Sequence, residues 1–171
     1  MNIFFAGATG VIGRQLLPRL IEAGHTVTAI TRSPDRVTQL RAAGAQPVIC
    51  DVFDRDTLAR AVRDAKPEVV IHQLTNIPQH LDTRRVDRDF AQTNRLRSEG
   101  TQLLMQAARA AGASQPLLLL GDLNMGEESD GYRVLAGELH DSYRQAGAGF
   151  GFTFPNDAKL LGRRILVPLV R

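Results

Sequence analysis

An α/β fold with a doubly wound parallel sheet, in three layers, is predicted by three features of the sequence. Apolar runs of strand length alternate with amphipathic stretches of helix length along most of the chain. A glycine-rich turn, Gly7 to Gly13, joins the first apolar run directly to the first amphipathic stretch. The stretches between successive runs are long enough for the crossovers that parallel strands require. We therefore expect the strand order 3-2-1-4-5 and an irregular C-terminal tail.

The first part of the chain supplies most of the expected sheet. Strands are expected at the short apolar runs 3–6, 25–30, 47–50 and 68–72. Helices are expected where apolar residues recur at helical spacing, at 11–21, 33–43 and 54–65. Gly24 ends the first helix and Ser33-Pro34 begins the second, because glycine favours a helix C-terminus and proline favours the first helical position.

The second part of the chain is less regular. After a loop over 76–85, the spacing of apolar residues predicts a long helix over 87–111. The leucine-rich run 116–120 follows as a fully buried fifth strand. A helix at 131–139 and a last strand at 165–170 complete the expected elements.

Composition indicates one globular domain. The 171 residues are 43% hydrophobic and 23% charged, which is ordinary for a protein that buries a single core. No apolar run approaches the roughly 20 residues that cross a bilayer, and no basic segment precedes an apolar one at the N-terminus. We therefore expect a cytoplasmic protein without a membrane partner. The arginines behind the net charge of +3 are scattered, so nucleic acid is not an expected partner.

The lone cysteine and the histidines predict no metal site. Cys50 has no disulfide or metal-ligand partner at a suitable spacing, and we interpret it as a small buried side chain at a strand end. The histidines also lack ligand spacing; they are His25, His72, His80 and His140.

The glycine turn carries the main functional prediction. A strand that turns directly into a helix points backbone N–H groups, backed by the positive end of the helix dipole, at whatever lies beyond the turn. The pattern G-x-x-G-x-x-G between a strand and a helix is typical of dinucleotide binding, and a purely structural tight turn is the alternative. The candidate cofactor-binding residues of the turn are Gly7, Thr9, Gly10, Val11, Ile12 and Gly13.

Five segments in order carry a resemblance to a known family: 7–13, Thr31-Arg32-Ser33, Asp51-Val52, 69–75, and Asn94 followed by Glu99-Gly100-Thr101. Through them, residues 1 to about 113 resemble the extended and atypical short-chain dehydrogenase/reductases, relatives of sugar-nucleotide epimerases and dehydratases. The resemblance implies a Rossmann-type fold that binds NAD or NADP. It further implies that Asp51 and Val52 border the adenine, and that Leu74 and Thr75 line the path to the nicotinamide. A turn or N-cap role is the alternative for Asp51.

The end of the second strand indicates which cofactor is bound. An acidic residue there would bind both ribose hydroxyls of NAD, whereas a basic residue would pair with the additional phosphate of NADP. The chain has Arg32 at this point and no acid before Asp35. A guanidinium group holds phosphate through parallel hydrogen bonds, so the sequence favours NADP over NAD. The alternative for Arg32 is a solvent-exposed residue at the helix entry.

The usual catalytic pair of that family is missing. The family places a tyrosine, acting as acid or base, four residues before a lysine. Tyr132 is followed at that spacing by Ala136, and Tyr143 by Gly147. We therefore expect a dinucleotide cofactor and a small-molecule substrate of undefined identity, without the usual tyrosine route to reduction. The oligomeric state is not predicted.

The C-terminal part shows a different resemblance. Pro116 to Asn124, the stretch 132–143 and Gly151 to Pro155 are similar to a fragment of the endonuclease/exonuclease/phosphatase family. The resemblance implies that Asp122 helps to activate water and that Asn124 contacts a scissile phosphate, in chemistry that also needs Mg²⁺. The sequence lacks the partner glutamate and C-terminal histidine of that chemistry, so loop and capping roles are the alternative.

Together these patterns predict one Rossmann-like domain over 1–171, with a dinucleotide-binding part at 1–113 and a segment of different resemblance at 114–171. A join near Gly112 to Pro116 indicates a fusion or chimera. The leading function is NADP binding in a protein related to epimerases, dehydratases and reductases. The alternatives are a Mg²⁺-dependent phosphodiesterase or phosphatase fragment, and a folded chimera without catalysis.

Overall fold

The computed structural model describes residues 1–77, 86–111, 118–120, 133, 159–160 and 163–164. Contacts within the chain divide it into two units, Met1–Asn124 and Met125–Arg171. The described part of the second unit includes one antiparallel pair, β6 (Lys159–Leu160) with β7 (Arg163–Arg164). The helix expected at 131–139, except Arg133, and the strand expected at 165–170 lie outside the described residues. The interpretation of 1–171 as a single domain stays a prediction.

The first unit is built on a five-stranded sheet in the order β3-β2-β1-β4-β5. Its strands are β1 (Asn2–Ala6), β2 (Thr26–Thr31), β3 (Gln46–Ile49), β4 (Val69–His72) and β5 (Leu118–Leu120). All four neighbouring pairs run parallel. In the centre, Ile3 of β1 lies opposite Val27 of β2 and Val69 of β4. The predicted fold class and strand order are confirmed.

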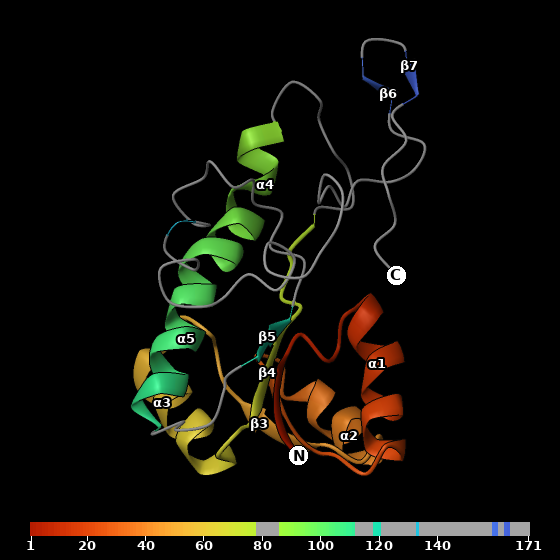
Figure 1. Ribbon diagram of the computed structural model, residues 1–171, viewed down its shortest axis with the longest axis vertical. Helices are drawn as coiled ribbons and strands as arrows, with labels where there is room; N and C mark the ends of the chain where they lie inside the picture. Colours follow the sequence, from red (N-terminus) through yellow and green to blue (C-terminus); the bar gives the residue numbers. More distant parts are fainter. Residues whose placement is uncertain (78–85, 112–117, 121–132, 134–158, 161–162, 165–171) are drawn as a thin grey trace. The chain divides into compact units, whose positions relative to one another are not determined.

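Helices connect the strands and lie on both faces of the sheet. They are α1 (Val11–Glu22), α2 (Asp35–Ala42), α3 (Arg55–Ala65), α4 (Val86–Arg95), the π-helical turn η1 (Leu96–Gly100) and α5 (Thr101–Ala110). Figure 1 shows α1 and α2 on one side of the sheet and α3 and α5 on the other. This arrangement follows from the pleat of a strand, because successive side chains point to opposite faces.

The central strand shows this division directly. Phe4 and Phe5 are both fully buried, but they belong to different core clusters. Phe5 packs in the cluster that contains Leu17 of α1 and Leu40 of α2, whereas Phe4 belongs with Leu104 of α5 and its neighbours. A strand covered on both faces is apolar at every position rather than at alternate ones, as the run Ile3 to Ala6 is.

Two helix predictions need correction. The long helix expected over 87–111 is interrupted by η1, where five residues form a wider π turn. Helix α2 begins at Asp35, later than Ser33, and no side chain caps its start. Instead the backbone carbonyl of Ser33 accepts from the N–H of Arg36.

No helix among the described residues has the length and apolar character that crossing a membrane requires.

Candidate functional site

A cleft of about 650 Å³ lies where four parallel strands of the first unit end. Its lining comes from the glycine turn after β1 and from the segments after β2, β3 and β4, with one residue of η1. The lining residues are Gly7, Thr9, Gly10, Ile30, Thr31, Arg32, Ser33, Pro34, Arg36, Cys50, Asp51, Val52, Gln73, Leu74, Thr75 and Leu96. In open α/β sheets this edge is where ligands bind, beside the point at which the strand order reverses.

Most of the sequence-predicted site residues meet in this cleft. Those that line it are Gly7, Thr9, Gly10, Arg32, Asp51, Val52, Leu74 and Thr75. Gly13 instead lies buried in the first turn of α1, while Val11 and Ile12 are 79% and 57% exposed and do not line the cleft. The role of these residues in cofactor binding stays a prediction.

The glycine turn is packed so tightly that side chains would not fit. Gly7 has φ +104°, and a Cβ built on it would lie 2.5 Å from the carbonyl carbon and oxygen of Gln73. A Cβ on Gly13 would lie 2.2 Å from the carbonyl oxygen of Gly7. The N–H of Gly10 donates to that same oxygen at 3.0 Å. The backbone therefore closes around itself and presents main-chain atoms, rather than side chains, at the end of β1.

The start of α1 is open to an anion. Within the part of the chain that the structure describes, no side chain caps Gly10 and the first turn of α1 contains no acidic residue. The first N–H groups of a helix lack partners within the helix and carry the positive end of its dipole. Because Gly10 also lines the cleft, this end of α1 fits a phosphate group.

Two arginines stand in the cleft at the end of β2. Arg32 and Arg36 both line it, together with Ser33. A guanidinium nitrogen of Arg32 lies 3.9 Å from Oδ2 of Asp51, and the two side chains are 62% and 41% exposed. An exposed pair at this distance is weak and readily exchanged for another partner. Arg32 therefore lines the cleft, and its weak ion pair with Asp51 leaves it able to bind a ligand.

The segment after β3 forms a tight turn along the cleft. Oδ1 of Asp51 accepts from the N–H of Phe53 at 3.0 Å, and the carbonyl of Asp51 accepts from the N–H of Asp54 at 3.0 Å. Asp51 therefore has the turn role considered as its alternative, and it lines the cleft as well. Cys50 before it is buried, and burial, with the nearby charges of Asp54 and Asp51, raises the pKa of its thiol to about 11.

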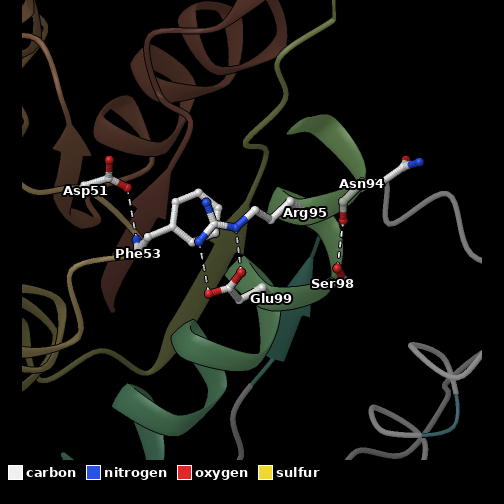
Figure 2. Close-up of polar contacts among 6 residues, drawn as sticks. All are labelled: Asp51, Phe53, Asn94, Arg95, Ser98 and Glu99. Atoms are coloured by element: carbon white, nitrogen blue, oxygen red, sulfur yellow. Dashed lines mark hydrogen bonds and ion pairs between the residues drawn. The ribbon is translucent and has the colours of Figure 1, made fainter. Parts of the chain in front are cut away.

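An arginine from α4 supports this turn from outside the cleft. Figure 2 shows the guanidinium group of Arg95 over the ring of Phe53, 4.0 Å from its centroid. Glu99 holds that guanidinium group through two hydrogen bonds, of 2.6 and 3.3 Å. Asn94 contributes its backbone carbonyl to Ser98, while its side chain points away from this group. The cation–π contact and the ion pair fix the turn after β3 against α4 and η1.

Several lining residues were not predicted from the sequence. Ser33 and Arg36 follow Arg32, and the repeated arginine at a helix start is a signal that could have indicated them. Gln73 directly precedes Leu74 and lies inside the segment 69–75 that carries the family resemblance. Leu96 belongs to η1, and no local sequence pattern predicts a π turn.

The second set of predicted residues is not described. Asp122 and Asn124 lie outside the described residues, as do Tyr132 and Tyr143. Among the residues that are described, no group of three or more histidine, cysteine, aspartate or glutamate side chains is placed to hold a metal ion.

A family model described as NAD(P)H-binding matches residues 7–147. Since this match covers most of the chain, the protein belongs to the NAD(P)H-binding family. The matched range extends across the join predicted near Gly112 to Pro116 and past Asp122 and Asn124. The interpretation of residues 114–171 as an endonuclease/exonuclease/phosphatase fragment, and of the chain as a chimera, therefore has no support. The leucine-rich run is the fifth strand of the same sheet, paired with β4.

A curated relative supports the reductase-like character of the family. The 3-diazoavenalumate denitrifying reductase of Streptomyces sp is 45% identical to this chain over 118 residues, which are 66% of this chain and 35% of the relative. The chain thus spans about a third of the length of this relative.

Solved structures share the fold. The enzyme WbmG of Bordetella bronchiseptica, in complex with NAD and UDP, is 26% identical with a TM-score of 0.53, over 70% of this chain and 36% of that one. Yeast methylglyoxal/isovaleraldehyde reductase Gre2, complexed with NADPH, is 18% identical with a TM-score of 0.55, over 70% and 36% of the two chains. Both are Rossmann-type structures that carry a nicotinamide dinucleotide, one NAD and the other NADPH.

Proposed function

We propose that this chain binds NADP in preference to NAD, in the cleft of the first unit, as the cofactor-binding part of a reductase. The observation that carries the proposal is the combination of an uncapped helix start behind a glycine turn with the arginines after β2. The glycine turn and the helix start fit a pyrophosphate. The arginines fit the additional phosphate that distinguishes NADP from NAD.

The chain's own residues fit the cofactor along the cleft. At the pyrophosphate, Gly7, Gly10 and Gly13 keep the backbone close and free of side chains, since a Cβ on Gly7 or Gly13 would collide with main-chain atoms. The other residues of the turn assigned to the cofactor are Thr9, Val11 and Ile12.

The placement of the two ends of the cofactor is the one that the resemblance to the short-chain dehydrogenase/reductases implies. Asp51 and Val52 would border the adenine, and Arg32 would leave its weak pair with Asp51 to bind the 2′-phosphate. Leu74 and Thr75, after β4, would lie along the nicotinamide half. Bound there, the nicotinamide ring supplies or accepts a hydride.

The reductase assignment rests on the curated relative, whose printed name is that of a reductase and which this chain matches at 45% identity. The substrate class that we propose for this chain is a small organic molecule reduced by hydride transfer. The alignment covers 35% of the relative's length. The proposal therefore concerns only the part of a reductase that binds the cofactor.

The test compares NADP with NAD in calorimetric titrations of the wild type and of Arg32→Gln, at low phosphate so that buffer anions do not compete. Wild type should bind NADP more tightly. Arg32→Gln should lose about 10- to 100-fold in NADP affinity, the value of a charge-assisted hydrogen bond, with little change for NAD.

Arg41→Gln is the matched control, because Arg41 is an exposed arginine of α2 that does not line the cleft. It should bind both cofactors as the wild type does. Tighter binding of NAD than of NADP by the wild type, or an equal loss for both cofactors in Arg32→Gln, would contradict the preference. A folded wild-type protein that binds neither would overturn the proposed function.

A further inference from the structure

A buried histidine that the proposed function leaves unused connects two sides of the cleft. His72 is the last residue of β4 and is 3% exposed. Its Nδ1 lies 3.2 Å from the backbone nitrogen of Leu74, and its Nε2 lies 3.1 Å from the carbonyl oxygen of Leu96. A backbone N–H only donates and a carbonyl only accepts, so the two bonds together require a neutral ring that carries its proton on Nε2.

Both partners of His72 line the cleft. Leu74 belongs to the segment after β4, and Leu96 is the first residue of η1. The imidazole therefore meets the helical run at the residue where its regular winding changes to a π turn. Helices are often distorted where a side chain inserts into their backbone hydrogen-bond ladder. Single π turns inside α-helices are also frequent at functional sites.

A second bond fastens the same segment. The N–H of Asn76 donates to Oγ1 of Thr93 in α4 at 3.1 Å, and Thr93 is fully buried. The N–H of Gln73 continues the sheet by donating to the carbonyl of Ala6 at 2.8 Å. The segment from Gln73 to Asn76 is thus held to β1 at its start and to the helical run by His72 and Thr93.

We propose that His72 is a positioning residue for cofactor binding, whose neutral imidazole holds the segment after β4 against η1 and thereby sets the surface on which the nicotinamide half of the dinucleotide lies. This inference rests on the proposed function, because it assigns that half of the cofactor to Leu74 and Thr75. His72 itself touches neither cofactor nor substrate in this assignment.

The surroundings of His72 keep it neutral near pH 7. Burial lowers its pKa below the ordinary value, the hydrogen bond with Leu96 opposes this shift, and the positive charge of Arg97 in η1 adds to it. Among the residues that the structure describes, Ala6 lies opposite His72 in β1 and Gly100 approaches the ring from the end of η1, and neither residue carries a charge. A protonated ring could no longer accept from Leu74, so acidification should release the segment.

The test measures two dissociation constants by calorimetry between pH 7.5 and pH 5, for NADP and for 2′-phospho-ADP-ribose, which lacks the nicotinamide ring. Both ligands carry the 2′-phosphate and the same pyrophosphate diester, so the titration of the 2′-phosphate cancels in the ratio of the two affinities. In the wild type, NADP should lose about 3- to 10-fold more affinity than 2′-phospho-ADP-ribose on acidification, which is the value of one backbone hydrogen bond.

The variants assign this effect to one ring. His72→Gln keeps a donor for Leu96 but loses the acceptor for Leu74, and its affinity ratio should already be low at pH 7.5 and independent of pH. His25→Gln is the matched control, because His25 lies outside the cleft, and it should follow the wild type. A ratio that changes with pH equally in His72→Gln and in the wild type would overturn the proposal.

A spectroscopic measurement keeps the proposal testable even if the variant folds poorly. Long-range nitrogen–proton spectra of the ¹⁵N-histidine-labelled wild type should show His72 as the neutral Nε2–H tautomer at pH 7. A charged ring or the other tautomer would overturn the proposal. If 2′-phospho-ADP-ribose and NADP both fail to bind the wild type, the proposed function fails. If both bind and the ratio of their affinities does not change with pH, only the role of His72 fails.

Discussion

Gly7 shows how a single residue shapes the site. Its φ of +104° lies in the region that L residues rarely adopt, and its missing side chain allows the backbone after β4 to approach. Gly24, at the end of α1, has a similar φ of +79°, but a Cβ there would meet nothing within 4 Å. A substitution at Gly24 therefore measures the free-energy cost of the backbone conformation alone. A substitution at Gly7 adds the cost of a steric collision.

Alanine substitutions at these two positions should have different effects. Gly24→Ala should reduce the free energy of unfolding by about 1 kcal/mol through its backbone alone and leave NADP affinity unchanged. Gly7→Ala must also displace Gln73, so it should be more destabilising and should weaken NADP binding by about tenfold or more. Urea unfolding and calorimetry measure both quantities. Equal affinities in Gly7→Ala and the wild type would show that the turn does not contact the cofactor.

The π turn shows what an element contributes beyond its length. A regular helix over 87–111 would satisfy the same pattern of apolar residues, yet the structure widens it at Leu96–Gly100. At that point the carbonyl of Leu96 contacts His72, and one residue earlier the side chain of Arg95 contacts Phe53. The helical run therefore braces the segments after β3 and β4, which both line the cleft.

The buried histidine at this element should make stability depend on pH. In the unfolded chain a histidine titrates near 6.5, whereas burial lowers the pKa of His72 in the folded protein. The unfolded state therefore takes up a proton first as the pH falls. The contribution of His72 is complete above about pH 7.5 and declines as the pH falls through 6.5 towards the folded pKa, by at most about 1.4 kcal/mol per pH unit.

Urea unfolding at several pH values between 8 and 5 measures this decline. The part due to His72 should be missing in His72→Gln and retained in His25→Gln. An unfolding free energy that rises on acidification over this range, or a decline that His72→Gln leaves intact, would contradict the prediction.

At the scale of the first unit, stability comes from two core clusters on opposite faces of one sheet. Leu17 of α1 belongs to one cluster and Leu104 of α5 to the other, and they are 2% and 1% exposed. The sheet lies between them, so the two side chains share no cavity. Both core clusters are needed for stability, because a parallel sheet buries both of its faces.

Truncation on the two faces should therefore be additive. Leu17→Ala and Leu104→Ala should each reduce the free energy of unfolding by about 2–5 kcal/mol. The double variant should equal the sum within about 0.5 kcal/mol. The midpoints of urea unfolding provide the measurement. A larger coupling energy would mean that the central strands shift when one face is truncated.

The sequence by itself determined the order of the strands and the place of the cleft. Apolar periodicity and the glycine turn are local properties, and parallel topology follows once strands alternate with helices. For the same reason Arg32, Asp51 and Leu74 could be predicted near one edge, since each lies within two residues of the end of a strand. The endonuclease/exonuclease/phosphatase resemblance, which the family match does not support, rested on three short segments, 116–124, 132–143 and 151–155. The first of them begins with a leucine-rich strand, a pattern that many α/β sheets share.

The tertiary structure decided what local patterns do not encode. It placed Arg36 and Leu96 in the cleft, left the side chains of Val11 and Ile12 outside its lining, and joined His72 to a carbonyl 24 residues away. Such contacts depend on how the helical run packs against the ends of the strands, not on residues adjacent in the chain. Periodicity defines which face of an element is buried, whereas packing alone decides which atoms on that face meet.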